Sequence, residues 1–314
     1  MLLAREELSH YAAGRATAIT LGVFDGVHLG HRHLIEALKE RAVARGLASG
    51  IVTLHPSPIQ VLRPEVRVAY LTSLEERIEL LRATGVDTVA PLTFTSEVAE
   101  LSAFDFLAML HGALDMRFLL MGPDNAFGRG REGTPQRVAE IADELGFDLE
   151  VLAQPLGPAG GGDGRVSATA IRNAIGDGDM EAAARLLGRP FSLRGPVVRG
   201  HERGRAIGFP TANMAVTPDR ALPAFGVYVT RSHVGGHSYP SATNIGVNPT
   251  FDDAMPSVET YILDFEGDLY GRELRIELLH RLRGELRFDG IDALVAAIAA
   301  DVAAVRAYFS SRDS

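Results

Sequence analysis

Short apolar stretches alternate with longer amphipathic ones through the first half of the sequence, and this alternation constrains the fold more than any other feature. Strands that alternate with helices of about 10 to 15 residues are typical of a parallel sheet with helices on both faces. The sequence therefore predicts an α/β fold with a doubly wound parallel sheet, whose ligands bind beyond the carboxyl ends of the strands. The expected strands are residues 16–24, 49–56, 86–94, 116–122 and 147–155, and the expected helices are 31–45, 73–85, 102–114 and 134–145.

Local signals mark the ends of several expected helices. Ser73 and Glu76 have the spacing of a capping box, and Gly85 is typical of a helix C-terminus. Thr134 followed by Pro135 predicts another helix start. The expected inward stripe of the helix at 31–45 consists of Leu34, Ala37, Leu38 and Ala42.

The pattern changes after about residue 186. Helical periodicity gives way to short apolar stretches interrupted by Gly, Pro and Asn, which is typical of a small antiparallel barrel or sandwich. Residues 291–309 predict an alanine-rich terminal helix that packs against it. We expect two domains, residues 1–186 and 187–314, with a short helical linker at 176–190 and a mobile loop at 157–165.

Composition narrows the chemistry. The net charge of −9 argues against non-specific nucleic-acid binding, because phosphate repels an acidic surface at long range. The absence of Cys excludes disulfides, thiolate catalysis and Cys-ligated zinc. Lys39 is the only lysine and lies outside any Gly-Lys-Ser/Thr triplet, so the chain has no P-loop. The charged N-terminus is unlike a signal peptide and no apolar run approaches about 18 residues, so we expect a cytoplasmic protein with no membrane partner.

Residues 22–31, GVFDGVHLGH, join the first expected strand to the first expected helix. His28 and His31 are three residues apart and therefore face the same side of a first helical turn. A helix N-terminus offers free amides and the positive end of the helix dipole, which suit a phosphate group. The glycines that leave room for a nucleotide against the backbone are Gly22, Gly26 and Gly30.

Two imidazoles at such a position suit attack on the α-phosphate of a nucleotide, where charge builds on the non-bridging oxygens as pyrophosphate leaves. Fixed N–H donors stabilise that charge electrostatically, and no covalent intermediate is needed. A zinc site built from Asp25, His28 and His31 is a weaker alternative, because the sequence shows no further ligand cluster. The histidines interpreted as structural are His10, His33 and His111.

The same stretch resembles the Gly-x-Phe-Asp-Gly-x-His-x-Gly-His signature of the bacterial bifunctional riboflavin kinase/FMN adenylyltransferase (FAD synthetase) family, and the likeness extends over nearly the whole chain. The resemblance implies an N-terminal nucleotidyltransferase (Rossmann-like) domain and a C-terminal antiparallel β-barrel riboflavin kinase domain with a terminal helix. It implies that His28 and His31 are catalytic. The implied ATP-binding residues of this motif are Gly22, Phe24, Asp25, Gly26 and Gly30.

A second stretch, RVSATAIR, resembles the family's Ser-Ser-Thr-x-Ile-Arg segment, which holds the ATP triphosphate. Ser167 or Thr169 can cap a helix, and Arg172 offers a planar guanidinium for bidentate bonds to phosphate. Ala168 stands where the family has a second serine, so this hydroxyl is missing.

Two further departures from the family pattern lie in the first domain. TLHPSP has Ser57 where the family has histidine, and GPDNAFG has Asn125 where the family has an aromatic residue. The resemblance implies that Asp124 and Asn125 contact flavin or nucleotide. These departures bear on the efficiency of adenylyl transfer and on the fit of the flavin.

RGHERGRAIGFPTAN, residues 199–213, resembles the riboflavin kinase signature of the family. Its glycines allow a tight loop to approach phosphates through backbone amides. Thr211 and Asn213 offer the hard oxygen ligands that suit Mg²⁺ beside nucleotide phosphates, and the family places its Mg·ATP there. The residues implied in ATP binding by the kinase are Gly200, Gly204, Arg205, Gly208, Thr211 and Asn213, the last two also as metal ligands.

The family carries its catalytic base as the glutamate of Val-Glu-x-His, and Glu259 stands in that place. A carboxylate beside the ribityl 5′-hydroxyl takes its proton as the γ-phosphoryl group transfers. Tyr261 replaces the family's histidine and shares a strand face with Glu259. Glu266 and Asp268 are interpreted as solvated charges in a polar turn.

Together these likenesses imply an enzyme that phosphorylates riboflavin with ATP to give FMN, then transfers AMP from ATP to FMN, giving FAD and pyrophosphate. One alternative is a riboflavin kinase whose nucleotidyltransferase domain is weakened or repurposed, and the three departures motivate it. A flavin-binding regulator without catalysis would require loss of Glu259 or of Thr211 and Asn213, all of which are present. The implied ligands are Mg²⁺ and the substrates ATP, riboflavin and FMN.

Overall fold

The structure is a computed structural model that describes residues 2–123, 125–152, 166–200, 204, 207–247 and 256–312. The chain divides into two compact units, Met1–Ala168 and Thr169–Ser314. Residues 169–186, which we expected in the first domain, therefore group with the second unit. The expected loop at 157–165 lies outside the described residues.

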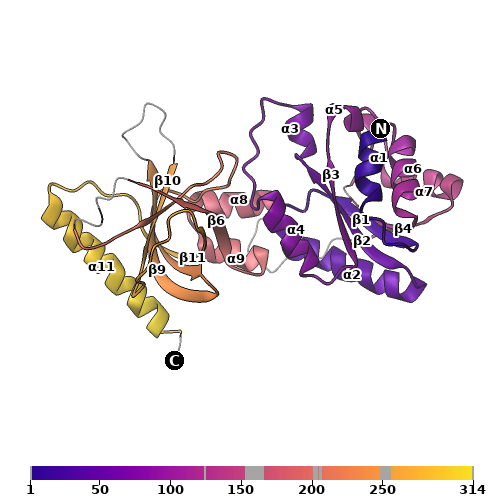
Figure 1. Cartoon of the computed structure of the whole chain (residues 1–314). Helices are drawn as coiled ribbons and strands as arrows, with labels where there is room; N and C mark the ends of the chain where they lie inside the picture. The colour runs from indigo at the N-terminus through magenta and orange to yellow at the C-terminus, as the bar shows by residue number, and fades with distance from the viewer. Residues whose placement is uncertain are drawn as a thin grey trace. The chain divides into compact units, whose positions relative to one another are not determined.

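The first unit contains a five-stranded parallel sheet in the order β3-β2-β1-β4-β5 (Figure 1). The register pairs Thr17 of β1 with Ala48 of β2, and Gly50 of β2 with Thr88 of β3. This confirms the predicted parallel sheet; β2 has the predicted length, shifted by one residue, and the other four strands are shorter than their apolar stretches. The strands are β1 (Thr17–Gly22), β2 (Ala48–His55), β3 (Thr88–Thr93), β4 (Met116–Met121) and β5 (Asp148–Val151).

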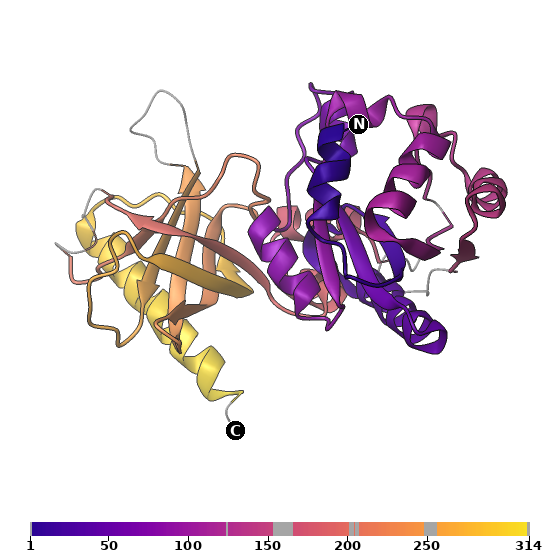
Figure 2. The ribbon, with the colours of Figure 1, turned by 45° about the vertical axis from the view of Figure 1, so that its right-hand side comes forward.

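Helices cover both faces of this sheet, as predicted (Figures 1 and 2). Alternate residues of one strand enter opposite layers: in β4, Phe118 and Leu120 pack with one set of helices, and Leu119 and Met121 with the other. The first layer contains α2 (Leu29–Arg45) and α4 (Leu74–Arg82), and the second contains α1 (Leu2–Ser9), α6 (Ala103–Leu114) and α7 (Pro135–Leu145). Sequence reasoning missed α1 and the short helices α3 (Pro58–Leu62) and α5 (Ser96–Ala99), which are too short to show a clear period.

The predicted helix ends are confirmed at two places. The Glu76 amide donates to the Ser73 hydroxyl at 3.1 Å, and the Ser73 amide donates to the Glu76 carboxylate at 2.8 Å, forming the capping box of α4. The Thr134 side chain caps α7, whose first residue is Pro135. In α2 the inward stripe is rotated slightly from the prediction: Ile35 is fully buried, joining Ala37, Leu38 and Ala42, while Leu34 is only partly buried.

The second unit contains a closed antiparallel barrel in the order β10-β7-β6-β11-β8-β9. This resolves the predicted choice between a barrel and a sandwich. Two helices, α8 (Ala168–Asp177) and α9 (Met180–Leu187), precede the barrel, and α9 packs against β6 and β11. The strands are β6 (Phe191–Val198), β7 (Ala212–Met214), β8 (Gly226–Val234), β9 (His237–Val247), β10 (Pro256–Ile262) and β11 (Glu273–Arg283).

A chain of hydroxyl groups runs through the barrel interior. Thr230, Ser232, Ser241, Thr243 and Thr260 are all fully buried. The Thr230 hydroxyl donates to the Ser241 carbonyl at 3.0 Å and lies 2.8 Å from the Thr243 hydroxyl, which is 2.9 Å from that of Thr260. Polar side chains are stable in this interior because they satisfy one another's hydrogen bonds.

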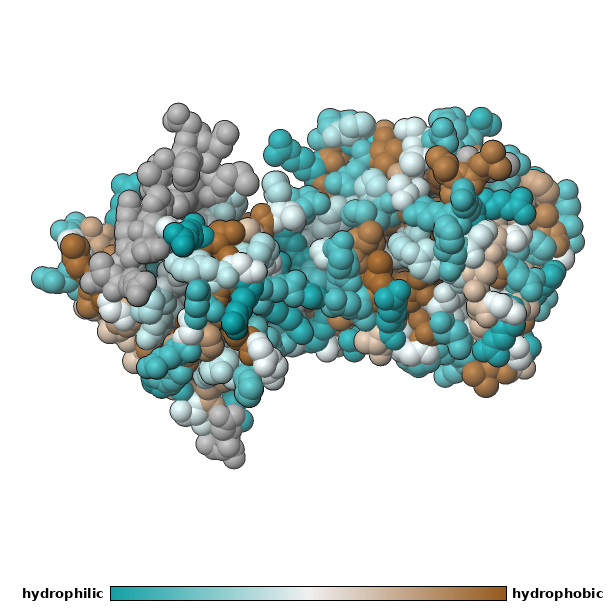
Figure 3. Space-filling model, viewed as in Figure 1, coloured by the Kyte–Doolittle hydropathy of each residue, from teal (hydrophilic) through white to brown (hydrophobic). Residues whose placement is uncertain are grey.

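Helix α11 (Ile291–Ser310) packs against β8 and β9, where Val305 joins an apolar cluster with Val229, Ala242 and Leu263. Among the described residues it is the helix long and apolar enough to cross a membrane, judged by length and composition alone. The structure confirms the terminal helix predicted at 291–309, whose many alanines raise its mean hydropathy without a strongly apolar run. On the face shown in Figure 3, apolar residues form separate patches among hydrophilic ones.

Candidate active sites

A strained turn follows the central strand β1 at its carboxyl end. Phe24, Gly26 and Val27 have φ values of 52°, 77° and 41°, within the short 3₁₀ segment η1 (Asp25–Val27) and the residue before it. A left-handed conformation is costly for Phe and especially for the β-branched Val. Such strain persists only where surrounding contacts over-determine it, and it clusters at functional sites.

The two motif histidines are brought together directly after this turn. His28 is the N-cap of α2, and its Nδ1 accepts a hydrogen bond from the His31 amide at 3.3 Å. The two rings stack with centroids 3.6 Å apart and an interplanar angle of 15°. A Cβ at Gly30 would lie 3.2 Å from the His28 ring, so this glycine gives the stacked pair its space. Because Nδ1 is an acceptor, neutral His28 carries its proton on Nε2.

The environment of His31 favours its neutral ring. Burial, followed by His28 and then Arg77, lowers the pKa of His31 well below its ordinary value of 6.5. Among the described residues, the buried Nδ1 of His31 has no hydrogen-bond partner. A partly desolvated pair of rings at a helix start can offer directed N–H donors to an incoming phosphate.

The Asp25 carboxylate, which we expected in the ATP site, is directed into the protein. It is 3% exposed and accepts hydrogen bonds from the amides of Leu71 at 2.9 Å and Thr72 at 3.1 Å. The Thr72 hydroxyl in turn accepts from the Gly26 amide at 3.1 Å. In this geometry Asp25 holds the turn in place, and a direct contact with ATP stays a prediction.

The second predicted ATP stretch begins beside the histidine motif. The Val166 carbonyl oxygen would lie 3.5 Å from a Cβ placed on Gly30. Helix α8 starts at Ala168, immediately after Ser167, which puts Ser167 at the expected cap position. Thr169 is exposed and Arg172 partly buried in the first turns of this helix.

Two of the residues that depart from the family pattern take part in local structure through their backbone amides. The Ser57 amide donates to the Tyr70 hydroxyl at 2.6 Å, and Ser57 is the N-cap residue of α3. The Asn125 amide donates to the Gly122 carbonyl at 3.2 Å, forming a turn. Asp124 lies outside the described residues.

In the second unit, two glycines of the 199–213 stretch pack directly on its two predicted metal ligands. A Cβ at Gly200 would lie 2.4 Å from the Asn213 amide nitrogen. A Cβ at Gly204 would lie 2.3 Å from the Phe209 carbonyl oxygen and 3.5 Å from the Thr211 hydroxyl. Gly208 has a φ of 87°, which favours glycine, and Arg205 lies outside the described residues.

Glu259 stands between two asparagines in the barrel sheet. The antiparallel register pairs it with Asn213 on β7 and with Asn244 on β9. Paired residues share a face and lie with Cβ atoms about 5 Å apart. Tyr261 shares that face and packs toward α11, whereas Val258 and Thr260 are buried in the barrel, as the predicted alternation requires. Sequence reasoning missed Asn244, because strand register is not visible in one chain.

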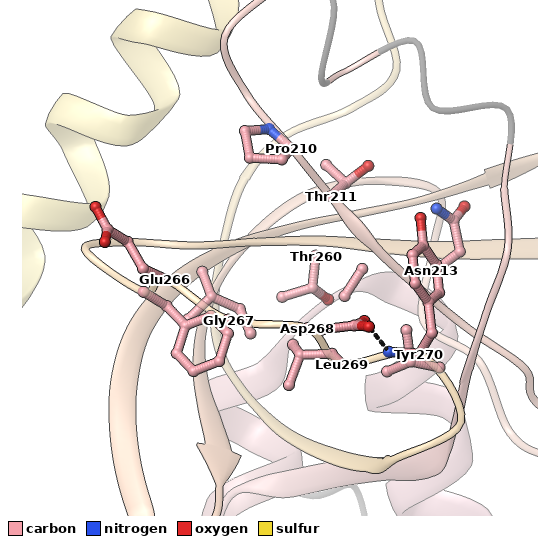
Figure 4. Close-up of a pocket in the computed structure, with 13 residues that line it drawn as sticks. Pro210, Thr211, Asn213, Thr260, Glu266, Gly267, Asp268, Leu269 and Tyr270 are labelled. Carbon is pink, nitrogen blue, oxygen red and sulfur yellow. Dashed lines mark hydrogen bonds between the residues drawn. The ribbon is translucent and has the colours of Figure 1, made fainter.

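A pocket of about 590 Å³ borders the same strand (Figure 4). Thr211 and Asn213 line it, whereas Glu259 is not among its described lining residues. Glu266 and Asp268 are exposed, as the interpretation as solvated charges expected, but both also line the pocket. The Asp268 carboxylate accepts a hydrogen bond from the Tyr270 amide at 2.9 Å. The signal that could have found them is their position in the turn that follows the strand of Glu259. The remaining lining residues include Val197, Pro210, Ala212, Thr260, Ile262, Phe265, Gly267, Leu269 and Tyr270.

A Rossmann-like unit with an imidazole pair at a helix start, followed by a closed barrel whose pocket carries Thr211 and Asn213, defines a two-domain nucleotide-dependent transferase. A family model described as FAD synthetase matches residues 11–169, and one described as riboflavin kinase matches residues 187–309. The chain belongs to the bifunctional riboflavin kinase/FMN adenylyltransferase family.

Curated relatives match along most of their length. The bifunctional riboflavin kinase/FMN adenylyltransferase of Listeria monocytogenes is 37% identical over 294 residues, covering 93% of this chain and 92% of that protein. The protein of the same name from Pseudomonas fluorescens is 39% identical over 295 residues, covering 93% of each chain. A crystal structure from Streptococcus pneumoniae, described as a macrolide-efflux protein, is 32% identical with a TM-score of 0.83, covering 93% of this chain and 94% of that one.

Proposed function

We propose that the first unit transfers AMP from ATP to FMN, with His28 and His31 as the catalytic residues. An FMN phosphate oxygen attacks the α-phosphorus of ATP, the new P–O bond forms, and the bond to pyrophosphate breaks. The two imidazoles donate hydrogen bonds to the charge that develops in this step. The stacked ring pair at the start of α2 is the observation that carries this proposal.

The surrounding residues hold the nucleotide. Gly22, Phe24, Gly26 and Gly30 shape the backbone against which ATP lies, and Asp25 supports them from behind. Ser167, Thr169 and Arg172 bind the triphosphate through the start of α8 and a guanidinium fork. Asp124 and Asn125 contact the flavin or the nucleotide.

We propose that the barrel phosphorylates riboflavin, with Glu259 as the base. Its carboxylate takes the proton of the ribityl 5′-hydroxyl while that oxygen bonds to the γ-phosphorus of ATP, and ADP leaves. The cross-strand pairing of Glu259 with Asn213 supports this role, because Asn213 lines the pocket. The loop residues that cradle the phosphates are Gly200, Gly204, Arg205 and Gly208.

Thr211 and Asn213 would hold Mg²⁺ with the phosphates of ATP. Their hydroxyl and amide oxygens are hard ligands, and the close approach of Gly200 restricts the Asn213 amide. Among the described residues, no cluster of three or more His, Asp or Glu side chains could hold a metal ion, so phosphate oxygens would complete the site. Bound Mg²⁺ would neutralise phosphate charge during transfer.

The alternative, a kinase with a weakened or repurposed first domain, is not favoured, because both family models match and curated relatives of the same name cover both units. We propose a cytoplasmic enzyme whose partners are the small molecules ATP, riboflavin and FMN.

Product analysis tests both activities. The full chain is incubated with ATP and Mg²⁺ and with either riboflavin or FMN, and the flavins are separated by chromatography. We expect FMN followed by FAD from riboflavin, and FAD from FMN. FMN as the only product would revive the alternative, and no product from either substrate would refute both proposed activities. Omission of Mg²⁺, with EDTA present, should stop FMN formation.

A further inference from the structure

Arg77 has the largest side chain among the fully buried ones of the described residues, and the two proposed reactions do not use it. It lies in the first turn of α4, and its side chain is 0% exposed. Removing a guanidinium from water is costly, so a buried arginine persists where its charge and donors have dedicated partners.

The guanidinium joins three segments at the carboxyl edge of the sheet. Nη1 donates to the Leu54 carbonyl at the end of β2 at 3.3 Å. Nη2 lies 3.8 Å from Oδ1 of Asp25, in the turn after β1. Cζ lies 5.3 Å from the centroid of the Tyr70 ring, in the segment before α4. Arg77 therefore links the Asp25 turn to the end of β2 and to the segment before α4.

The carboxylate of Asp25, which faces Arg77, is held by backbone amides. Asp25 is 3% exposed and holds the amides of Leu71 and Thr72. An anion buried this deeply needs a nearby cation, and Arg77 supplies it. With Asp25 fixed, the left-handed residues Phe24 and Val27 stay in the conformation that leads into His28.

We propose that Arg77 is a positioning residue for adenylyl transfer, which holds the Asp25 carboxylate and through it the turn that presents His28 and His31. This inference rests on the proposed function of the first unit. The same charge helps to keep the ring of His31 neutral, after burial and His28. Arg77 touches neither substrate in this role.

The test compares Arg77→Met and Arg77→Lys in the full chain. Leu81→Ala is the matched control, because Leu81 is a fully buried apolar residue of the same helix, and its truncation removes packing but no charge. Thr72→Val is an independent variant that removes the hydroxyl between Asp25 and the Gly26 amide. For each, the rate of FAD formation from FMN at saturating ATP, the rate of FMN formation from riboflavin, and the thermal midpoint are measured.

We expect Arg77→Met to lower the saturating rate of FAD formation about 100-fold, since misplacing a reacting group by about 1 Å has effects of this size. FMN formation should stay near the parental rate, and Arg77→Lys should recover FAD formation to within about tenfold of the parent. Leu81→Ala should retain FAD formation within about threefold despite a lower thermal midpoint. Thr72→Val should lower it at least about tenfold.

The proposal would be overturned if Arg77→Met formed FAD within about threefold of the parental rate. It would also be overturned if Leu81→Ala lost as much FAD formation as Arg77→Met while the two variants had the same thermal midpoint. If Arg77→Met does not fold, Thr72→Val decides: a parental rate overturns the proposal and a tenfold loss supports it. A parent chain that makes no FAD would refute the proposed function itself, which separates the two failures.

Discussion

The imidazole rings of His28 and His31 stack with centroids 3.6 Å apart, and the Nδ1 of His28 accepts the amide hydrogen of His31. One residue thus caps α2 while the other projects from its first turn. The pair, the helix start and the strained turn before them form one unit, in which the backbone conformation fixes the direction of both rings.

Replacing both histidines should separate the two activities. His28→Ala with His31→Ala should lower FAD formation by at least about 1,000-fold, since removal of one fixed donor to a developing charge costs about 100- to 1,000-fold. FMN formation should be unchanged, because Glu259 and the pocket lie in the other unit. His33→Ala, an exposed position on the same helix, is the control. Equal loss of both activities in a folded variant would contradict the two-site assignment.

The pH dependence of FAD formation should follow the lowered pKa of His31. Because burial, His28 and Arg77 favour the neutral ring, the rate should hold as pH falls through 6.5 and decline only at lower pH. The unfolded chain binds a proton at His31 near pH 6.5 while the folded chain does not, so this group lowers folding stability as pH falls below 6.5. His31→Gln should weaken that loss in thermal scans, and an unchanged dependence would argue against a neutral His31.

Glu259→Gln should impair the kinase alone. The amide cannot accept the hydroxyl proton, so FMN formation should fall about 100- to 10,000-fold while FAD formation from supplied FMN continues. The saturating rate should change more than the KM for ATP, because Glu259 is not among the described residues that line the pocket. Glu273→Gln, on the exposed start of β11, serves as the control. A retained kinase rate would remove Glu259 as the base.

Gly200→Ala should disturb Asn213. The added Cβ would lie 2.4 to 2.6 Å from Nδ2, Cγ and Oδ1 of Asn213, so this side chain must move. We expect the KM for ATP in FMN formation to rise at least about tenfold, by displacement of a proposed metal ligand. Gly176→Ala is the control, because a Cβ there meets nothing within 4 Å on helix α8. Equal KM values in the two variants would show that Asn213 does not bind the nucleotide complex.

Thr230→Val should destabilise the barrel. The change removes the hydroxyl that contacts both Ser241 and Thr243 and leaves buried polar atoms unsatisfied. Chemical denaturation should show a loss of about 1–3 kcal/mol in the free energy of unfolding. Thr217→Val, at an exposed position, should change it by less than about 0.5 kcal/mol. An unchanged free energy of unfolding in Thr230→Val would mean that the hydroxyl chain does not contribute to stability.

The sequence by itself determined the elements whose signals are local. The strand and helix alternation to residue 155 predicted the parallel sheet, and Ser73, Glu76, Thr134 and Pro135 marked helix ends, because caps depend on residues three or four apart. The histidine spacing likewise placed both rings on one turn. The terminal helix predicted at 291–309 is confirmed as α11, whereas short helices such as α3 and α5 carry too few residues to show a period.

Tertiary structure alone decided which distant residues meet. Arg77 and Asp25 are 52 positions apart, and only the packing of α4 against the sheet edge makes a buried pair of them. The register of β10 with β7 and β9 set Glu259 between Asn213 and Asn244, since a shift of one residue would turn each side chain to the opposite face. The sequence contains these residues, but their partners follow from burial and strand pairing across the whole fold, which local patterns do not encode.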